Sequence, residues 1–185
     1  MRFTAIFSTG LLAASVASAQ SCTGDDRREA LREIVEAIIS GTDEDINKPS
    51  FESNVTVYVD IQGARFITGK GPDGARNSIR LGHAIATDFG PAPYDLNSYL
   101  DNGVNMAFVN GTATVGVHIP DEGPLSLVVV PAQLSSTHDT DTCEIYEAVA
   151  AVQPVDGVVQ AALTAAMLQN YPLYEVLDPL EGVSS

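Results

Sequence analysis

The feature that most constrains the fold is the stretch VNMAFVNGTATVGVHI, residues 104–119. At its centre lies Asn110–Gly111, a pair typical of a two-residue β-hairpin turn because both residues tolerate the positive φ that such a turn needs. A turn there sets apolar side chains opposite one another on one face: Phe108 opposite Ala113, Met106 opposite Val115, and Val104 opposite Val117. The stretch therefore predicts the centre of an antiparallel sheet with one buried face.

The first twenty residues have the pattern of a secretory signal peptide. Arg2 precedes an apolar run, and Ala17 and Ala19 form the A-x-A pattern of a signal-peptidase site, so we expect residues 1–19 to be removed near Gln20. The apolar run is too short for a membrane anchor, and no second hydrophobic stretch of spanning length follows it. The sequence predicts a secreted, extracellular protein.

The charge of the chain argues against nucleic acids and membrane surfaces as partners. The formal net charge is −15, from 9 Lys and Arg against 24 Asp and Glu, whereas binding to phosphate-rich surfaces needs an excess of Lys and Arg. The roughly 165 residues after the signal are enough for one domain with a sizeable core. We expect that domain over residues 20–155, followed by a helix and tail over 156–185 that pack on it.

Two cysteines and two glycosylation sequons fit an extracellular protein. Cys22 and Cys143 are the only cysteines, and an isolated pair in an oxidising compartment is most simply a disulfide. Neither has a close His or Cys neighbour in the sequence, which argues against a metal site or a thiol enzyme. Asn54 and Asn110 begin N-x-T sequons, and the second would be exposed at the predicted hairpin tip.

Three helices are predicted from apolar side chains at helical spacing. The first runs from Asp25 towards Gly41, with Thr23 as its N-cap, and a short capped turn follows it and stops at Pro49. The second lies within residues 69–90 and ends at Gly90–Pro91, because Ile79, Gly82, Ile85, Ala86 and Phe89 share one helical face. The third lies within residues 155–171.

Strands are predicted where apolar and polar residues alternate. Residues 51–63 form the clearest case, with Val55, Val57, Val59 and Ile61 on one face, and residues 64–68 continue or pair with this strand. A strand before residue 101 is expected to turn through a three-residue loop over 101–103, which sets Leu100 against Val104. Later strands are expected at residues 125–134, where Pro131 marks an edge or a bulge, and at 143–152.

This order of elements resembles the nuclear-transport-factor-two-like superfamily, including its SnoaL-like and ketosteroid-isomerase-like branches. The likeness lies in ALREIVEAIISGTDEDINKPSFESNVTVYVD, in GKGPDGARNSIRLGHAI and in the closing meander through CEIYEAVAAV, and it spans about residues 25–152. It implies an α+β cone, a curved antiparallel sheet wrapped around the N-terminal helix. Such cones hold small, mostly apolar molecules, and some members isomerise, dehydrate or cyclise them, although a fold by itself does not confer activity.

The resemblance also points to candidate catalytic residues. Asp60 is nearest to the aspartate base of steroid-isomerase-like members, but Val59 occupies the matching position, and a slip of one residue reverses the face. Tyr58 shares the face of Asp60, and a phenol beside a carboxylate can polarise a carbonyl and move a proton. His83 lies at the edge of its helix, and the resemblance implies that it points into the cone mouth, as a histidine from this helix does in dehydratase-like relatives. His118 lies on the polar face of its strand. For each residue, the alternative is a solvated surface side chain.

The densest group of potential metal ligands is His138, Asp139, Asp141 and Glu144, whose oxygen atoms suit calcium. Its spacing matches no calcium-loop motif, and an acidic hairpin tip needs no metal. The sequence also has no G-x-S-x-G, no phosphate-binding glycine loop and no zinc-ligand spacing, so we expect neither a metal nor a cofactor.

Three functions stay open from the sequence. The first is a secreted protein that binds a small apolar molecule, and the second is a cofactor-independent isomerase or dehydratase that uses Asp60, Tyr58 and either His83 or His118. The third is an interaction or effector-like protein that forms a homodimer through the outer face of the sheet. An apolar cavity favours the first, an ionisable pair inside a closed cavity the second, and a filled cone with an exposed apolar face the third.

Overall fold

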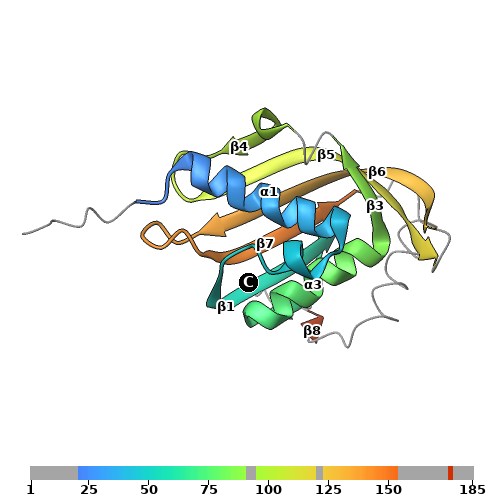
Figure 1. Ribbon diagram of the computed structural model, residues 1–185, viewed down its shortest axis with the longest axis horizontal. Coiled ribbons are helices and arrows are strands. Elements are labelled where there is room, and N and C mark those ends of the chain that lie inside the picture. The colour runs from blue at the N-terminus through green and yellow to red at the C-terminus, as the bar shows by residue number, and fades with distance from the viewer. Residues whose placement is uncertain (1–20, 91–94, 120–122, 154–174, 177–185) are drawn as a thin grey trace, which may run out of the picture.

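The computed structural model describes residues 21–90, 95–119, 123–153 and 175–176, which form three α-helices and one sheet (Figure 1). The predicted signal peptide and the predicted C-terminal helix lie outside these residues.

The first helix, α1, spans Gly24–Ser40, and local signals fix both of its ends as predicted. The Thr23 Oγ1 accepts a hydrogen bond from the Asp26 amide at 3.2 Å, and the Asp26 carboxylate accepts one from the Thr23 amide at 2.9 Å, which makes a capping box. Gly41 ends the helix with a φ of 64°. The short predicted turn is α2, Asp43–Ile46, whose N-cap is Thr42.

The eight strands form one mixed sheet in the order β3-β5-β6-β7-β1-β2-β8, and β4 also pairs with β5. The bounds are β1 Phe51–Ile61, β2 Ala64–Lys70, β3 Ala86–Gly90, β4 Tyr99–Asp101, β5 Met106–Ile119, β6 Gly123–His138, β7 Ile145–Val152 and β8 Glu175–Val176. All pairs are antiparallel except β1 with β7, which is parallel and corrects the expected all-antiparallel sheet. Because a helix and five strands separate β1 from β7 in the chain, no hairpin constrains their direction.

The predicted hairpin at Asn110–Gly111 is wrong, because β5 runs unbroken through both residues. They pair with Gln133 and Ala132 of β6, and Gly111 lacks the positive φ of a turn. Glycine is required at position 111 for a different reason, because a Cβ atom built there would lie 2.0 Å from the carbonyl oxygen of Gly90. Gly111 is needed for close backbone approach at the place where β4 stops pairing with β5 and β3 begins.

The second long helix, α3, spans Gly71–Ile85 and ends earlier than predicted. Residues Ala86–Gly90 form β3 instead, which pairs with β5 and buries Phe89 to 4% exposure. Phe89 belonged to the apolar spacing that suggested a longer helix. In the structure it reaches the core from the strand instead. The partner strand lies more than twenty residues away, so local spacing could not reveal it.

The loop between β4 and β5 also differs from the prediction. Leu100 pairs with Phe108 rather than Val104, and the connection covers residues 102–105. The Asn102 Oδ1 accepts hydrogen bonds from three amides, those of Val104, Asn105 and Met106, at 2.9–3.0 Å. This side chain replaces the backbone bonds that a tighter turn would have made.

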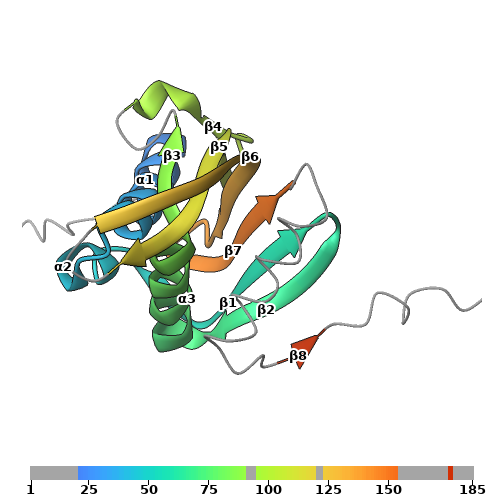
Figure 2. The same ribbon diagram turned by 90° about the vertical axis from the view of Figure 1, so that its right-hand side faces the viewer.

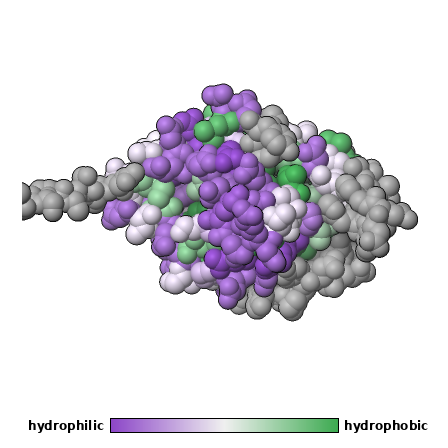
Figure 3. All heavy atoms as spheres, in the orientation of Figure 1, coloured by the Kyte–Doolittle hydropathy of each residue, from purple (hydrophilic) through white to green (hydrophobic). Residues whose placement is uncertain are grey.

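The sheet curves, and α1 and α3 cover its concave face (Figures 1 and 2). One buried cluster joins Leu31 and Val35 of α1 to the β3–β6 side of the sheet, and a second joins Ile34 and Ala37 to α3, β1 and β7. The face seen in Figure 3 is mainly hydrophilic, with small separate hydrophobic groups. The α+β cone is therefore confirmed by the strand pairing and the helix packing of this chain.

Candidate ligand-binding cavity

A partly enclosed cavity of about 120 Å³ lies between the concave face of the sheet and the two long helices. On β6, Ala132 and Leu134 point to this side, and on β7 their pairing partners Val152 and Ala150 do the same. Small alanine side chains on neighbouring strands leave space that leucine would fill, so the sheet contributes a wall with a hollow at its centre.

The helices supply the roof of the cavity. Its α1 part consists of Leu31, Ile34, Val35 and Ile38, the apolar stripe that the sequence predicts. The helix α3 adds Ile79 and Ile85. At Gly82 the two helices approach closely, because a Cβ there would lie 3.2 Å from a side-chain carbon of Ile38.

Two hydroxyl groups that line the cavity are hydrogen-bonded to the protein backbone. The Ser78 hydroxyl donates to the Gly74 carbonyl at 3.0 Å, and the Thr68 hydroxyl donates to the Val57 carbonyl at 3.4 Å. No Asp, Glu, His, Lys or Arg belongs to the described residues that line the cavity. The lining can therefore hold apolar atoms, and its hydroxyl oxygens retain lone pairs for one or two hydrogen bonds.

Asp60 lies outside the cavity, at the turn between β1 and β2. Its Oδ1 accepts a hydrogen bond from the Gly63 amide at 2.7 Å, and its Oδ2 lies 3.9 Å from Arg65. In the sheet, Asp60 pairs with Ala151, which faces away from the concave side. The carboxylate stabilises a turn at the rim, which matches the surface alternative for this residue.

Tyr58 borders the cavity but belongs to the same strand face as Asp60. The guanidinium of Arg65 lies over its ring, 5.3 Å from the ring centroid. A cation in that position contacts the π face of the ring and holds it near an exposed side chain. Tyr58 and Asp60 therefore both contact Arg65, and the phenol–carboxylate pair does not converge inside the cone.

His83 links α3 to the end of α1. Its Nδ1 lies 2.9 Å from the carbonyl oxygen of Ile38, and because a carbonyl only accepts, Nδ1 donates. The bond satisfies one of the carbonyl groups that a helix C-terminus leaves free. The side chain is half-buried against Gly41 rather than in open solvent, and His83 is not among the described residues that line the cavity.

His118 is placed on β5 opposite Pro124, but its side chain lies outside the described part of the chain. Both sequon asparagines, Asn54 and Asn110, are exposed. Asn110 lies within a strand rather than at a hairpin tip, and its Oδ1 accepts from the Gln133 side chain at 2.7 Å.

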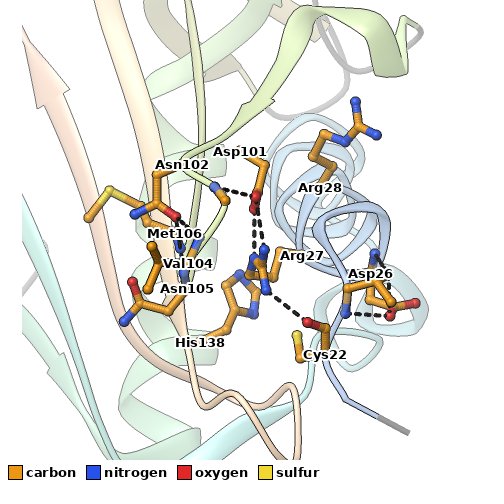
Figure 4. A network of polar contacts seen from close by, with 12 residues as sticks. Cys22, Asp26, Arg27, Arg28, Asp101, Asn102, Val104, Asn105, Met106 and His138 are labelled. Atoms are coloured by element: carbon orange, nitrogen blue, oxygen red, sulfur yellow. Dashed lines mark hydrogen bonds and ion pairs between the residues drawn. The ribbon is translucent and has the colours of Figure 1, made fainter.

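A polar cluster, which we call the clasp, lies between the start of α1 and the sheet (Figure 4). It consists of Cys22, Arg27, Asp101, Ser136, His138 and Cys143. The predicted Cys22–Cys143 disulfide is confirmed, and it ties the start of α1 to the turn between β6 and β7. Beside it, Arg27 donates two hydrogen bonds to Asp101, at 2.6 and 2.8 Å, and a third to the Cys22 carbonyl at 2.9 Å. Arg27 is only 4% exposed, and its guanidinium holds the pKa of Asp101 below the usual value.

No sequence pattern pointed directly to this ion pair. Arg27 lies among five charged residues that all look solvated, and its partner is 74 positions away. The one available hint was Cys22, because a disulfide at the start of α1 draws the neighbouring turn against the sheet.

His138 belongs to the clasp rather than to a calcium site. Its Nε2 lies 2.8 Å from the Ser136 hydroxyl and its Nδ1 lies 3.2 Å from the Cys143 carbonyl. Burial lowers the pKa of His138, and the hydrogen bond to Cys143 opposes that shift. Asp139 caps the β6–β7 turn by accepting from the amides of Asp141 and Thr142, so these residues do not converge as ligands.

Comparison with known proteins finds similarity only in three dimensions. No family model matches the chain, and no curated protein matches its sequence. A candidate SnoaL-like polyketide cyclase from Shewanella denitrificans has 12% identity and a TM-score of 0.49, over 78% of this chain and 98% of that one. A phenazine biosynthesis-related protein from Pseudomonas aeruginosa has 13% identity and a TM-score of 0.46, over 86% and 96%.

A de novo designed protein with a curved β-sheet is similar as well, with 14% identity and a TM-score of 0.47 over 77% of this chain and 98% of that one. Among the described residues, no helix combines the length and the apolar character needed to cross a membrane.

Proposed function

We propose that this protein binds a small apolar molecule in the cavity beneath α1 and α3, and that it does so outside the cell. The observation that carries the proposal is a lining without any Asp, Glu, His, Lys or Arg among its described residues. Such a surface gains free energy when an apolar molecule replaces the water or empty space inside it.

The volume limits the size of the ligand. A cavity of 150 Å³ lined by Leu, Ile and Phe accepts benzene, so a cavity of about 120 Å³ suits a compound with one small ring. The hydroxyl groups of Ser78 and Thr68 can each accept a further hydrogen bond from such a ring if it carries one polar hydrogen.

The extracellular location is supported by the signal-peptide pattern over residues 1–19 and by the disulfide. Glycans on Asn54 and Asn110 belong to the same proposal, since both side chains are exposed. The acidic surface suits a soluble protein whose partners are neither nucleic acids nor membranes.

The second candidate, a cofactor-independent isomerase or dehydratase, needs an acid or base within reach of the ligand. Asp60 and His83 are engaged elsewhere, and Tyr58 is the one titratable residue among the described cavity neighbours. Binding without turnover is therefore the better-supported proposal. Homodimer formation through the outer face stays a prediction, for which sedimentation of the purified protein is the measurement.

Thermal unfolding with toluene as a probe tests the proposal. Because toluene would bind the folded state only, we expect stabilisation that approaches about 2.7 kcal/mol at a concentration one hundred times Kd. The variant Ala150→Leu fills the cavity from β7 and should abolish the shift, whereas Ala84→Leu, on the exposed side of α3, should retain it.

Equal shifts in the two variants would mean that toluene binds elsewhere. No shift in the natural protein with toluene, or with the slightly more polar phenol, would refute the binding proposal.

A further inference from the structure

We propose that the reduced form of this protein binds one zinc ion through Cys22, Cys143 and His138, and that the disulfide closes this site. The inference concerns the clasp and is independent of the cavity and of any ligand there.

The three side chains already converge. A ring nitrogen of His138 and the two sulfur atoms all lie within 4.8 Å of one another. Zinc with ligands at about 2.3 Å for sulfur and about 2.0 Å for nitrogen needs these atoms roughly 3.5–3.8 Å apart. Once the S–S bond is broken, side-chain rotations of about 1–2 Å bring all three atoms to zinc-binding distances.

His138 is prepared as a ligand. Because the Cys143 carbonyl can only accept a hydrogen bond, the proton of the neutral ring resides on Nδ1, and Nε2 carries a lone pair. A carbonyl partner on one ring nitrogen is the arrangement that fixes the tautomer and orientation of zinc-binding histidines. The Ser136 hydroxyl, 2.8 Å from Nε2, is close enough to follow as a fourth ligand or to hold a water molecule there.

The charges around the site balance when zinc is bound. Two thiolates neutralise Zn²⁺, His138 binds as the neutral ring, and the adjacent Arg27 is paired with Asp101 at 2.6 Å. The metal-free reduced site holds two neutral thiols. Zinc replaces both thiol protons, so the site beside His138, which is 1% exposed, stays without net charge.

The chemistry is a reduction followed by proton release. A phosphine reductant gives two electrons to the disulfide and takes up the oxygen of a water molecule, whose two hydrogens protonate the sulfurs. Zinc then replaces both thiol protons, which leave to solvent. The metal thereby rejoins the start of α1 to the β6–β7 turn.

Native mass spectrometry and melting measurements on the full mature protein test this proposal. The protein is reduced with the phosphine, the reductant is removed, and one equivalent of zinc chloride is added without air. We expect the reduced protein to melt at a lower temperature than the disulfide form, to retain one zinc with loss of two protons, and to regain about 5 °C. The disulfide form should retain none.

Matched variants separate this site from adventitious binding. The variant His138→Gln keeps a hydrogen-bonding side chain but should lose the zinc, and His83→Gln, a histidine outside the clasp, should keep it. Cys22→Ser, which leaves His138 in place, should also lose zinc. Retention of zinc by Cys22→Ser or His138→Gln, or failure of the reduced natural protein to bind zinc, overturns the proposal.

Discussion

The concave face of β6 passes through two different environments within seven residues. Ala132 and Leu134 border an apolar hollow, whereas Ser136 and His138, next along the same face, are buried in a polar cluster where His138 makes hydrogen bonds through both ring nitrogens. Both ends of this face are covered by α1. The difference shows that hydrogen bonds and a disulfide hold α1 against one end of the concave face, whereas the other end is incompletely filled by side chains.

This division has a physical reason. A hollow lowers stability because its lining lacks contacts, and the loss grows with its volume. The clasp offsets that loss through the Cys22–Cys143 disulfide and through a buried ion pair in which Arg27 donates two hydrogen bonds to Asp101. If this is correct, the free energy of unfolding should rise when side chains are enlarged in the hollow, and it should fall when the clasp or the filled core is altered.

The largest expected effect comes from breaking the ion pair of the clasp. The variant Arg27→Ala leaves the Asp101 carboxylate without its partner in a largely buried position, so we expect the free energy of unfolding to fall by about 3 kcal/mol. Urea denaturation measures this loss. The control Arg28→Ala removes a pair with the exposed Asp25 and should change stability by less than about 0.5 kcal/mol. Equal losses in the two variants would contradict the special role of the clasp.

A smaller effect, of opposite sign, should follow when an alanine that lines the hollow and an alanine in the filled core are each replaced by valine. Ala150→Val places them in the hollow and should raise the free energy of unfolding by about 0.5–1 kcal/mol. Ala107→Val places them at a position that is 0% exposed and outside the cavity lining, where overpacking should cost about 1–3 kcal/mol. Destabilisation by both changes would show that the hollow is already filled.

The smallest effect should appear as a dependence of stability on pH. Burial lowers the pKa of His138 below its ordinary value of 6.5, so the unfolded chain takes up a proton before the folded protein does. The contribution of His138 is fully present above about pH 6.5 and is lost as the pH falls toward the lowered folded value. Urea midpoints at pH 5 and pH 7 measure the loss.

In that experiment, His138→Gln should flatten the dependence and His83→Gln should preserve it. Asp101 does not interfere between pH 5 and pH 7, because its own pKa is lowered from 3.8 by Arg27. A slope that survives in His138→Gln would assign the effect to another group.

Sequence reasoning succeeded where a signal is local or the choice is forced. Thr23 and Gly41 define α1 through their own side chain or backbone, and Cys22 could pair only with Cys143. It failed at Asn110–Gly111, where a strong turn signal is overridden because β5 pairs with β6 on one side and with β4 and β3 on the other. A glycine that serves close packing looks the same in a sequence as one that serves a turn.

The candidate site shows the same limit. The apolar stripe of α1 was predictable from its spacing, yet Asp60 and His83 were candidates whose partners, Gly63 and Ile38, could be known only from coordinates. The clasp pair Arg27–Asp101 was missed entirely because it joins segments 74 residues apart.

By itself, then, the sequence determined which residues are apolar, where α1 begins and ends, and which cysteines join. Only the tertiary structure decided the register of β5, the direction of β7 against β1, and the presence of a hollow beside a clasp. The physical reason is that caps and periodicity act within a few residues, whereas strand register and unfilled volume depend on how distant segments meet.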